Sequence, residues 1–367
     1  MGKKRFFDDR LKYLSFIQNT SEKKAISSKI YPYIANMSQN KSYLRILDAG
    51  TGDGTIKSNV IKAFHRYHPY SSLLITGKEI SYEDLKNTLE KMPDRFVEHP
   101  NLLITMTNVK FSELSLIENT SKIKNKKVRE YNLVLRSNNS YDFNSQITGN
   151  NLGNFIKKNW GIQIDRNSRT SYSDPCIIRI YRQDHERHLK QFLRNDYKNN
   201  KYDLIIASQS YRAASSVKAK VNNVINPLMN LLNNSGKLLI THSIGGAKIQ
   251  KIINLAFKDL EAFPNTAKDI IKYLKNTNVP DDGSFKYFAP KKYTFNFKKA
   301  PDQTVTELFG HNTDAKWSNI LYVAQIPNKD IQEVEKNIKL LNKIRKTINN
   351  SGTILFENEL FSIKRVK

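Results

Sequence analysis

Residues 48–54 (DAGTGDG) form the segment of this sequence that is best suited to bind a ligand. Glycine lacks a Cβ atom, so the backbone can approach a ligand closely. A helix that begins after such a turn also presents free N–H groups, which suit a carboxylate or a phosphate. Glu79 follows the segment by about 25 residues, and an acid near this place in nucleotide-binding folds accepts hydrogen bonds from ribose hydroxyls. Together these features predict a site for a ligand that contains a ribose.

Two acids in the same segment indicate which ligand this is. Asp48 precedes the loop and Asp53 lies inside it, so both would meet the pyrophosphate of NAD with negative charge. The spacing is also G-x-G-x-G, whereas dinucleotide folds use G-x-G-x-x-G. S-adenosyl-L-methionine carries an ammonium and a sulfonium group, and it therefore suits these acids better. The competing interpretation is a tight turn beside an exposed glutamate.

Alternating strands and helices are predicted around this loop. The expected strands are seven short runs, apolar or alternating: 43–48, 73–79, 102–107, 202–207, 237–242, 293–297 and 320–324. Such a pattern gives an α/β fold with a doubly wound, mostly parallel, seven-stranded sheet. Ligands of such sheets bind outside the carboxyl ends of the strands. The loop and Glu79 both lie at strand ends of this kind.

Four parts are expected along the chain. Residues 1–40 are predicted to form an N-terminal helical lid, and 41–117 together with 201–327 form the core. Residues 118–200 are rich in Asn, Lys, Arg and Ser. They are too long for a connection within a compact α/β unit, so we expect an inserted subdomain there. Residues 328–367 are expected to form a charged helix and a closing strand.

Residues 48–54 resemble motif I of the class I (Rossmann-like) S-adenosylmethionine-dependent methyltransferases. The resemblance implies that Gly50 and Gly52 lie under the methionine part of the cofactor and that Glu79 binds its ribose. It also places Asn108 near the adenine and Ser208 near the methionine. The implied cofactor-binding residues are Asp48, Gly50, Gly52, Glu79, Asn108 and Ser208.

More of the chain resembles histamine N-methyltransferase and its small-molecule relatives. Residues 19–22 (NTSE) look like that subgroup's lid, where a glutamate meets the substrate amine. Residues 355–360 (LFENEL) resemble a closing strand whose Asn contacts the substrate. Gln209 falls on a glutamine beside the methyl-transfer position. The resemblance implies substrate-binding roles for Glu22, Gln209, Tyr211 and Asn358, with Glu22 and Gln209 catalytic.

The expected activity is transfer of a methyl group to a small-molecule acceptor, with an amine as the candidate. The sulfonium methyl is already activated, so the protein must mainly hold the acceptor in line. Glu22 could accept or orient the proton that an amine loses, although a helix-start role explains Ser21-Glu22 equally well. Two alternatives remain: an RNA methyltransferase that binds RNA through the basic insertion, and a noncatalytic binding protein on the same scaffold.

Net charge and composition limit which partners, compartment and metal sites can be expected. The formal net charge is +26, which attracts phosphates, but a Lys-, Asn- and Ile-rich composition also follows from an A+T-rich genome. Nucleic acid is therefore a possible but less favoured partner. No membrane partner is expected, because no apolar run is long enough to cross a bilayer. Cys176 is the single cysteine, which fits a reducing, cytoplasmic compartment. No metal site is expected, since His185 and His188 are flanked by arginines and lack helical i, i+4 spacing.

Overall fold

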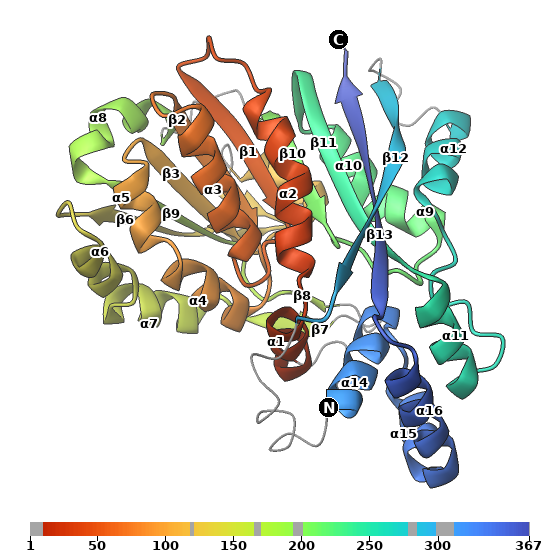
Figure 1. Cartoon of the computed structure of the whole chain (residues 1–367). Coiled ribbons are helices and arrows are strands. Elements are labelled where there is room, and N and C mark those ends of the chain that lie inside the picture. The colour runs from red at the N-terminus through yellow and green to blue at the C-terminus, as the bar shows by residue number, and fades with distance from the viewer. Residues whose placement is uncertain are drawn as a thin grey trace.

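The computed structural model describes residues 10–117, 121–164, 170–193, 201–277, 285–298 and 312–366. Figure 1 shows a central sheet with helices packed on both of its faces and a further group of helices at one end. The first nine residues of the predicted lid, and parts of the predicted insertion, lie outside the described ranges. The predicted fold class, a mostly parallel α/β sheet covered on both faces, is confirmed.

The sheet has nine strands in the order β12-β13-β11-β10-β1-β2-β3-β9-β6. Its strands are β1 (Tyr43–Ala49), β2 (Ser72–Lys78), β3 (Leu102–Thr107), β6 (Arg129–Leu135), β9 (Cys176–Arg182), β10 (Tyr202–Ser208), β11 (Leu232–Gly245), β12 (Phe285–Asn296) and β13 (Leu355–Arg365). Two small hairpins lie outside it, β4 (Lys122–Ile123) with β5 (Lys126–Lys127) and β7 (Ile162–Ile164) with β8 (Thr170–Tyr172).

The five parallel strands predicted at the centre of the sheet are confirmed as β1, β2, β3, β10 and β11. All six residues of β3 are buried, as are the last six of β1. Burial of both faces explains why these strands read as apolar runs without alternation. The strand order reverses between β1 and β10, so the carboxyl end of β1 is a topological switch point.

The seventh strand lies elsewhere than predicted. Residues 320–324 belong to helix α14 (Asn312–Ala324), and β13 takes the antiparallel place between β11 and β12. Trp317, Ile320, Leu321 and Ala324 are buried, which is the i, i+3, i+4, i+7 spacing of one helix face. A short apolar run cannot be assigned to strand or helix by its composition alone, so the prediction was wrong for this physical reason.

The sheet is also wider than the seven strands predicted. β9 pairs antiparallel with β3, and β6 pairs parallel with β9. Both strands come from the residues predicted as an insertion, and they extend the central sheet at its β3 edge. An open edge exposes unpaired N–H and C=O groups, and β9 covers that edge of β3.

Helices cover both faces of the sheet. The helices are α1 (Arg10–Asn19), α2 (Glu22–Ala35), α3 (Thr55–Tyr67), α4 (Tyr82–Glu90), α5 (Pro93–Glu98), α6 (Ser140–Ile147), α7 (Asn150–Asn159), α8 (Glu186–Leu189), α9 (Val217–Lys220), α10 (Asn226–Met229), α11 (Ala247–Ala256), α12 (Ala267–Thr277), α15 (Asn328–Lys336) and α16 (Ile338–Asn350). Between α9 and α10 the chain passes through a π-helical segment, Val221–Ile225. The charged helix predicted over 329–349 is two helices, divided at Asn337.

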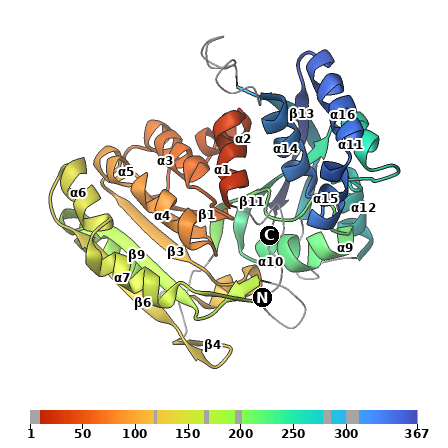
Figure 2. The ribbon, with the colours of Figure 1, turned by 90° about the horizontal axis from the view of Figure 1, so that it is seen from below.

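Two hydrophobic clusters define the two faces. On the α3 face, Ile46 and Ile206 pack with Ile30 of α2 and Phe64 of α3. On the opposite α12 face, Ile205, Ile240 and Phe361 pack with residues of α10 and α12. A third cluster joins α11, α14, α15 and α16 to the ends of β12 and β13. Figure 2 shows α1 and α2 between the α3–α5 group and these C-terminal helices.

Candidate active site

The glycine loop lies at the carboxyl end of β1, between β1 and α3. Gly52 has φ +57° and Gly54 has φ +80°, a backbone region that side chains with a Cβ rarely adopt. The N–H groups of Gly50 and Thr51 donate to the Lys78 carbonyl of β2, at 3.2 and 3.0 Å. These bonds fix the loop against the end of the neighbouring strand.

Glu79 contacts the loop directly. Its Oε2 accepts a hydrogen bond from Gly52 N–H at 2.8 Å, and its Oε1 accepts from Ile80 and Ser81 N–H at 2.7 and 2.8 Å. The structure thus brings together the two elements that the sequence pairs. A carboxylate offers about four lone-pair positions, so one remains for an external donor. The ribose-binding role of Glu79 stays a prediction.

Asp48 and Lys57 are two buried charges beneath the loop. The Oδ2 of Asp48 and the Nζ of Lys57 have no hydrogen-bond partner among the described residues. Burial raises the pKa of Asp48, although Lys57 opposes this. Burial likewise lowers the pKa of Lys57 to about 8. An unpartnered carboxylate oxygen at a strand end is a polar group that a ligand could satisfy.

Tyr13 of α1 covers the loop, and it was not among the predicted site residues. Its hydroxyl accepts a hydrogen bond from Asp53 N–H at 3.2 Å. A Cβ atom built on Gly52 would lie 2.3 Å from the same hydroxyl. The space that the missing side chain of Gly52 leaves is therefore filled by the hydroxyl of Tyr13. Lys12 and Tyr13 resemble part of the small-molecule subgroup's lid, but the resemblance gave Tyr13 no site role.

Three of the four residues that the resemblance assigned to the substrate lie together, and Tyr211 is not one of them. Gln209 Nε2 donates to Glu22 Oε1 at 3.2 Å, and Ser243 N–H donates to Gln209 Oε1 at 3.3 Å. The Asn358 side chain is hydrogen-bonded to Glu22 and donates to the Tyr293 hydroxyl at 3.2 Å. These side chains come from α2, β12, β13 and the loop after β10, so tertiary structure alone assembles them.

Burial gives this cluster unusual electrostatics. Glu22 is only 4% exposed, and burial raises the pKa of its carboxyl group although Lys23 opposes the shift. The Nζ of Lys23 lies 3.9 Å from Glu22 Oε2. Burial alone would lower the pKa of Lys23, but Tyr13, Glu22 and Asp53 raise it above its usual value. The Lys23 ammonium therefore interacts electrostatically both with Glu22 of the cluster and with Asp53 of the glycine loop.

Other predicted site residues are placed differently. The Asn108 side chain donates to the Asp174 carbonyl and accepts from Cys176 N–H, at 2.9 and 2.8 Å. Both of its polar groups therefore join β3 to the start of β9, and a contact with adenine stays a prediction. Ser208 is buried, and its Oγ has no partner among the described residues. The Tyr211 hydroxyl is hydrogen-bonded to His242.

Lys23 and Tyr293 were missed by the sequence analysis. A signal was present for each, because Lys23 follows Glu22 directly and Tyr293 begins the alternating run predicted as the sixth strand. Lys23 resembles the many other lysines of this chain, however, and nothing in the sequence shows that its side chain is mostly buried.

Metal and membrane features are absent from the part of the chain that the structure describes. No group of three or more His, Cys, Asp or Glu side chains there could hold a metal ion. His185 Nδ1 instead lies 2.5 Å from the Asn101 side-chain oxygen. None of the described helices is both long and apolar enough to cross a bilayer.

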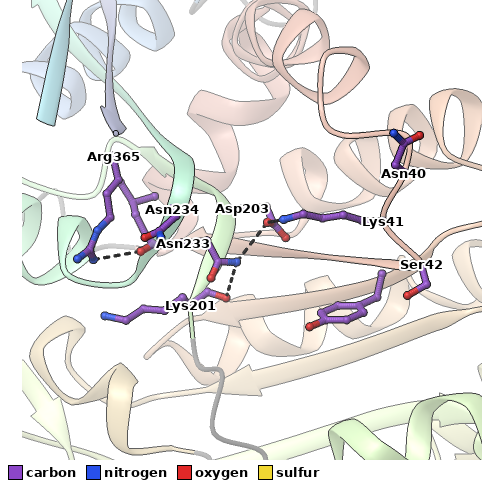
Figure 3. A pocket seen from close by; sticks show the side chains of 10 residues that line it. Asn40, Lys41, Ser42, Lys201, Asp203, Asn233, Asn234 and Arg365 are labelled. Carbon is purple, nitrogen blue, oxygen red and sulfur yellow. Dashed lines mark hydrogen bonds and ion pairs between the residues drawn. The ribbon is translucent and has the colours of Figure 1, made fainter. Parts of the chain in front are cut away.

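A cavity of about 610 Å³ opens at the opposite edge of the sheet. Figure 3 shows that Lys41, Lys201 and Asp203, at or next to the amino ends of β1 and β10, line it together with Arg365. Lys41 Nζ donates to Asp203 at 2.6 Å. No predicted site residue lines this cavity, so its position does not bear on the chemistry at the carboxyl edge.

Comparisons with known proteins give distant similarities. No protein-family model matches the chain, and no curated protein matches it. Among solved structures, the [4+2]-cyclase SpnF is 10% identical, with a TM-score of 0.37 over 92% of this chain and 82% of that one. The cyclopropane synthase MmaA2 from Mycobacterium tuberculosis is 11% identical, with a TM-score of 0.35 over 92% and 83%.

A geranyl diphosphate methyltransferase in complex with SAM is also similar, at 8% identity. Its TM-score is 0.35, over 93% of this chain and 85% of that one. With TM-scores below 0.5, these similarities are too distant to assign a function to this chain.

Proposed function

We propose that this protein is an S-adenosylmethionine-dependent methyltransferase that acts on a small-molecule acceptor. The observation that carries the proposal is the hydrogen bond of 2.8 Å between Gly52 N–H and Glu79. It joins the glycine loop to the acid of the next strand at the switch point of the sheet, where ligands of such folds bind.

The residues at this edge suit the proposed cofactor. Asp48 Oδ2 and Ser208 Oγ are buried polar atoms without partners among the described residues, and each needs a hydrogen-bond partner. We infer that Glu79 holds the ribose and that the Gly50–Gly52 backbone holds the methionine part. Because the Tyr13 hydroxyl fills the space over Gly52, the side chain of Tyr13 must move when the cofactor binds. The bound cofactor supplies an activated methyl group.

Glu22, Gln209 and Asn358 form the proposed acceptor site. Glu22 is 4% exposed and Asn358 is fully buried, so the acceptor they could bind is small. Gln209 and Asn358 would orient it through their amide groups. An amine acceptor must lose a proton, and the Glu22 carboxyl, whose pKa burial raises, is the proposed proton acceptor.

The structure favours this proposal over an RNA substrate. Three of the insertion aromatics, Trp160, Tyr172 and Tyr181, are 3–5% exposed, whereas Tyr141 is 80% exposed. Arg179 and Arg182 are also buried, and each pairs with a carboxylate, Glu130 or Asp184. Arg166 and Arg169 lie outside the described residues. Stacking on unpaired bases requires accessible rings, and the rings of Trp160, Tyr172 and Tyr181 are buried, which leaves Tyr141 as a single exposed ring among the described residues of the insertion.

Calorimetric titration with S-adenosylmethionine tests the proposal. Wild-type protein should bind, and Gly52→Val should abolish the binding heat because a branched side chain would occupy cofactor space. Gly153→Val is the matched control, since nothing lies within 4 Å of a Cβ built there. Thermal unfolding of both variants shows whether they remain folded. Equal affinity of wild-type and Gly52→Val protein would contradict the proposal, as would the absence of wild-type binding.

The acceptor can then be sought with methyl-labelled cofactor. A metabolite extract and total RNA, incubated side by side with the enzyme, separate small from macromolecular acceptors. Transfer of label to RNA alone would contradict the small-molecule proposal while leaving the cofactor assignment intact.

A further inference from the structure

A second polar network lies on the α12 face of the sheet, opposite Glu22 and Asn358. The Tyr211 hydroxyl is 2.5 Å from His242 Nδ1, and His242 Nε2 is 3.4 Å from Glu359 Oε2. Ala267 N–H, at the start of α12, donates to the same Glu359 oxygen at 2.7 Å. His242 is 1% exposed and Glu359 is 4% exposed. A buried polar chain of this kind is costly unless every member is satisfied.

The protons in this network have one consistent arrangement. Burial lowers the pKa of His242, so the ring is neutral. Burial alone would raise the pKa of Glu359, but hydrogen bonds from His242 and Ala267 lower it, so the carboxyl is ionised. Burial raises the pKa of Tyr211, so its hydroxyl keeps its proton. Nε2–H therefore donates to Glu359, and Nδ1 accepts from Tyr211.

The network holds a backbone segment that is strained. Gln209 has φ +52°, in the left-handed region that a residue other than glycine occupies only when its surroundings impose it. Before this residue, Gln209 N–H donates to the Thr241 carbonyl at 3.0 Å. After it, the Ser210 hydroxyl donates to the Ala49 carbonyl. Tyr211 then returns the chain to the α12 face.

We propose that Tyr211, His242 and Glu359 are positioning residues: they form a brace that holds the loop after β10 so that the Gln209 carboxamide bridges Glu22 and Ser243. The brace is anchored at the first residue of α12 by Ala267 and at β13 by Glu359. A role of Gln209 in orienting the acceptor rests on the proposed function, but the existence of the brace does not.

A double-mutant cycle of unfolding equilibria tests the brace without cofactor or acceptor. Gln209→Ala should change the unfolding equilibrium constant about tenfold in the wild-type background, because the carboxamide loses its two partners. In a Tyr211→Phe background, Gln209→Ala should change the unfolding equilibrium constant less than about threefold. The Gln209 carboxamide of that background has already lost its hydrogen bonds to Glu22 and Ser243. Tyr172→Phe is the matched control, since its hydroxyl donates to Glu113 at 2.8 Å on the same face, away from this loop.

Hydrogen exchange at the peptide that contains Ser243 gives the second measurement. Tyr211→Phe and His242→Ala should each speed its exchange about tenfold, since Ser243 N–H loses its Gln209 acceptor. His242→Asn should restore slow exchange, because the Asn side-chain oxygen can take the place of Nδ1. Tyr172→Phe should leave it unchanged.

The outcomes are distinct. Additive Tyr211 and Gln209 effects, or equal exchange in the His242→Asn and His242→Ala variants, would overturn the brace. If methyl transfer is established, Tyr211→Phe should raise the acceptor KM about tenfold and leave cofactor affinity unchanged. A brace without methyl transfer would overturn the proposed function alone.

Discussion

Glu79 combines a structural and a proposed ligand-binding role. Three backbone N–H groups orient its carboxylate, and Glu79→Ala should therefore weaken S-adenosylmethionine affinity by about 1–3 kcal/mol, the range for a charge-assisted bond to a buried group. Glu83→Ala, at an exposed position on α4, is the control in the same calorimetric titration. Wild-type affinity in Glu79→Ala protein would remove Glu79 from the site.

Lys57 should make stability depend on pH. Its folded pKa is about 8, lowered by burial from 10.5, so between these values the unfolded chain binds more protons and stability rises with pH. The stability of the wild type relative to Lys57→Met should thus rise by about 1–3 kcal/mol from pH 8 to 10.5. Urea unfolding across this range measures the difference. Lys62→Met, an exposed control on α3, should show none, and a pH-independent difference for Lys57→Met would contradict the shifted pKa.

Residues differ in how far sequence could predict them. Gly52 and Glu79 were predictable because a contiguous motif and a fixed spacing place them at adjacent strand ends. Glu22 and Asn358 were found through a family resemblance alone, since they lie at opposite ends of the chain and meet only through tertiary packing. Tyr13 resembles part of the subgroup's lid, but its place over Gly52 depends on how α1 packs.

At the scale of elements, the N-terminal helices act as one cover. The α1–α2 junction is tied to the end of β12, where Ser21 N–H donates to the Asn296 carbonyl at 2.9 Å and Lys298 N–H donates to the Asn19 carbonyl at 2.8 Å. Tyr13 of α1 also packs near Tyr322 of α14, with ring centroids 6.2 Å apart. The predicted helices here are confirmed, but their contacts could not be read from periodicity.

Tyr13→Phe tests whether this cover competes with the cofactor. The substitution removes the hydroxyl that accepts from Asp53 N–H and fills the space over Gly52. S-adenosylmethionine should therefore bind about three- to tenfold more tightly and associate faster, as expected when a hydrogen bond of about 1 kcal/mol is no longer lost on binding. Stopped-flow and calorimetry measure this, with Tyr31→Phe on α2 as control. Weaker binding would mean that the hydroxyl contacts the cofactor.

Element type was more predictable than element pairing. The short apolar runs at 132–135 and 176–181 in the predicted insertion form parts of β6 and β9. Their pairing with β3 was not expected, because strand partners across an insertion leave no periodic signal. At 320–324 the element type itself was predicted wrongly, because a short apolar run can be buried equally well in a helix or in a strand.

At the scale of the whole molecule, the wide sheet separates two environments. The carboxyl edge carries the glycine loop and the acceptor cluster under α1 and α2, and the amino edge carries the open cavity of Figure 3. Strands β6 and β9 of the insertion pair with the central sheet and widen it at the β3 edge. Among the described residues of the insertion, four exposed lysines lie on the β4–β5 hairpin, where Ile123 is buried between Lys122 and Lys124.

The net charge of +26 leads to a last prediction, which concerns the whole surface. Because Trp160, Tyr172 and Tyr181 of the insertion are buried and Tyr141 alone among its described tyrosines and tryptophan is exposed, RNA should bind mainly through diffuse charge, with an affinity that falls steeply with salt. Replacing four lysines with glutamine should then weaken binding equally in either of two exposed sets: Lys122, Lys124, Lys126 and Lys127, or Lys336, Lys339, Lys343 and Lys346. Fluorescence anisotropy with a labelled RNA at several salt concentrations measures both. A loss confined to the hairpin set would show a specific RNA-binding arm, and the acceptor would then have to be sought among nucleic acids.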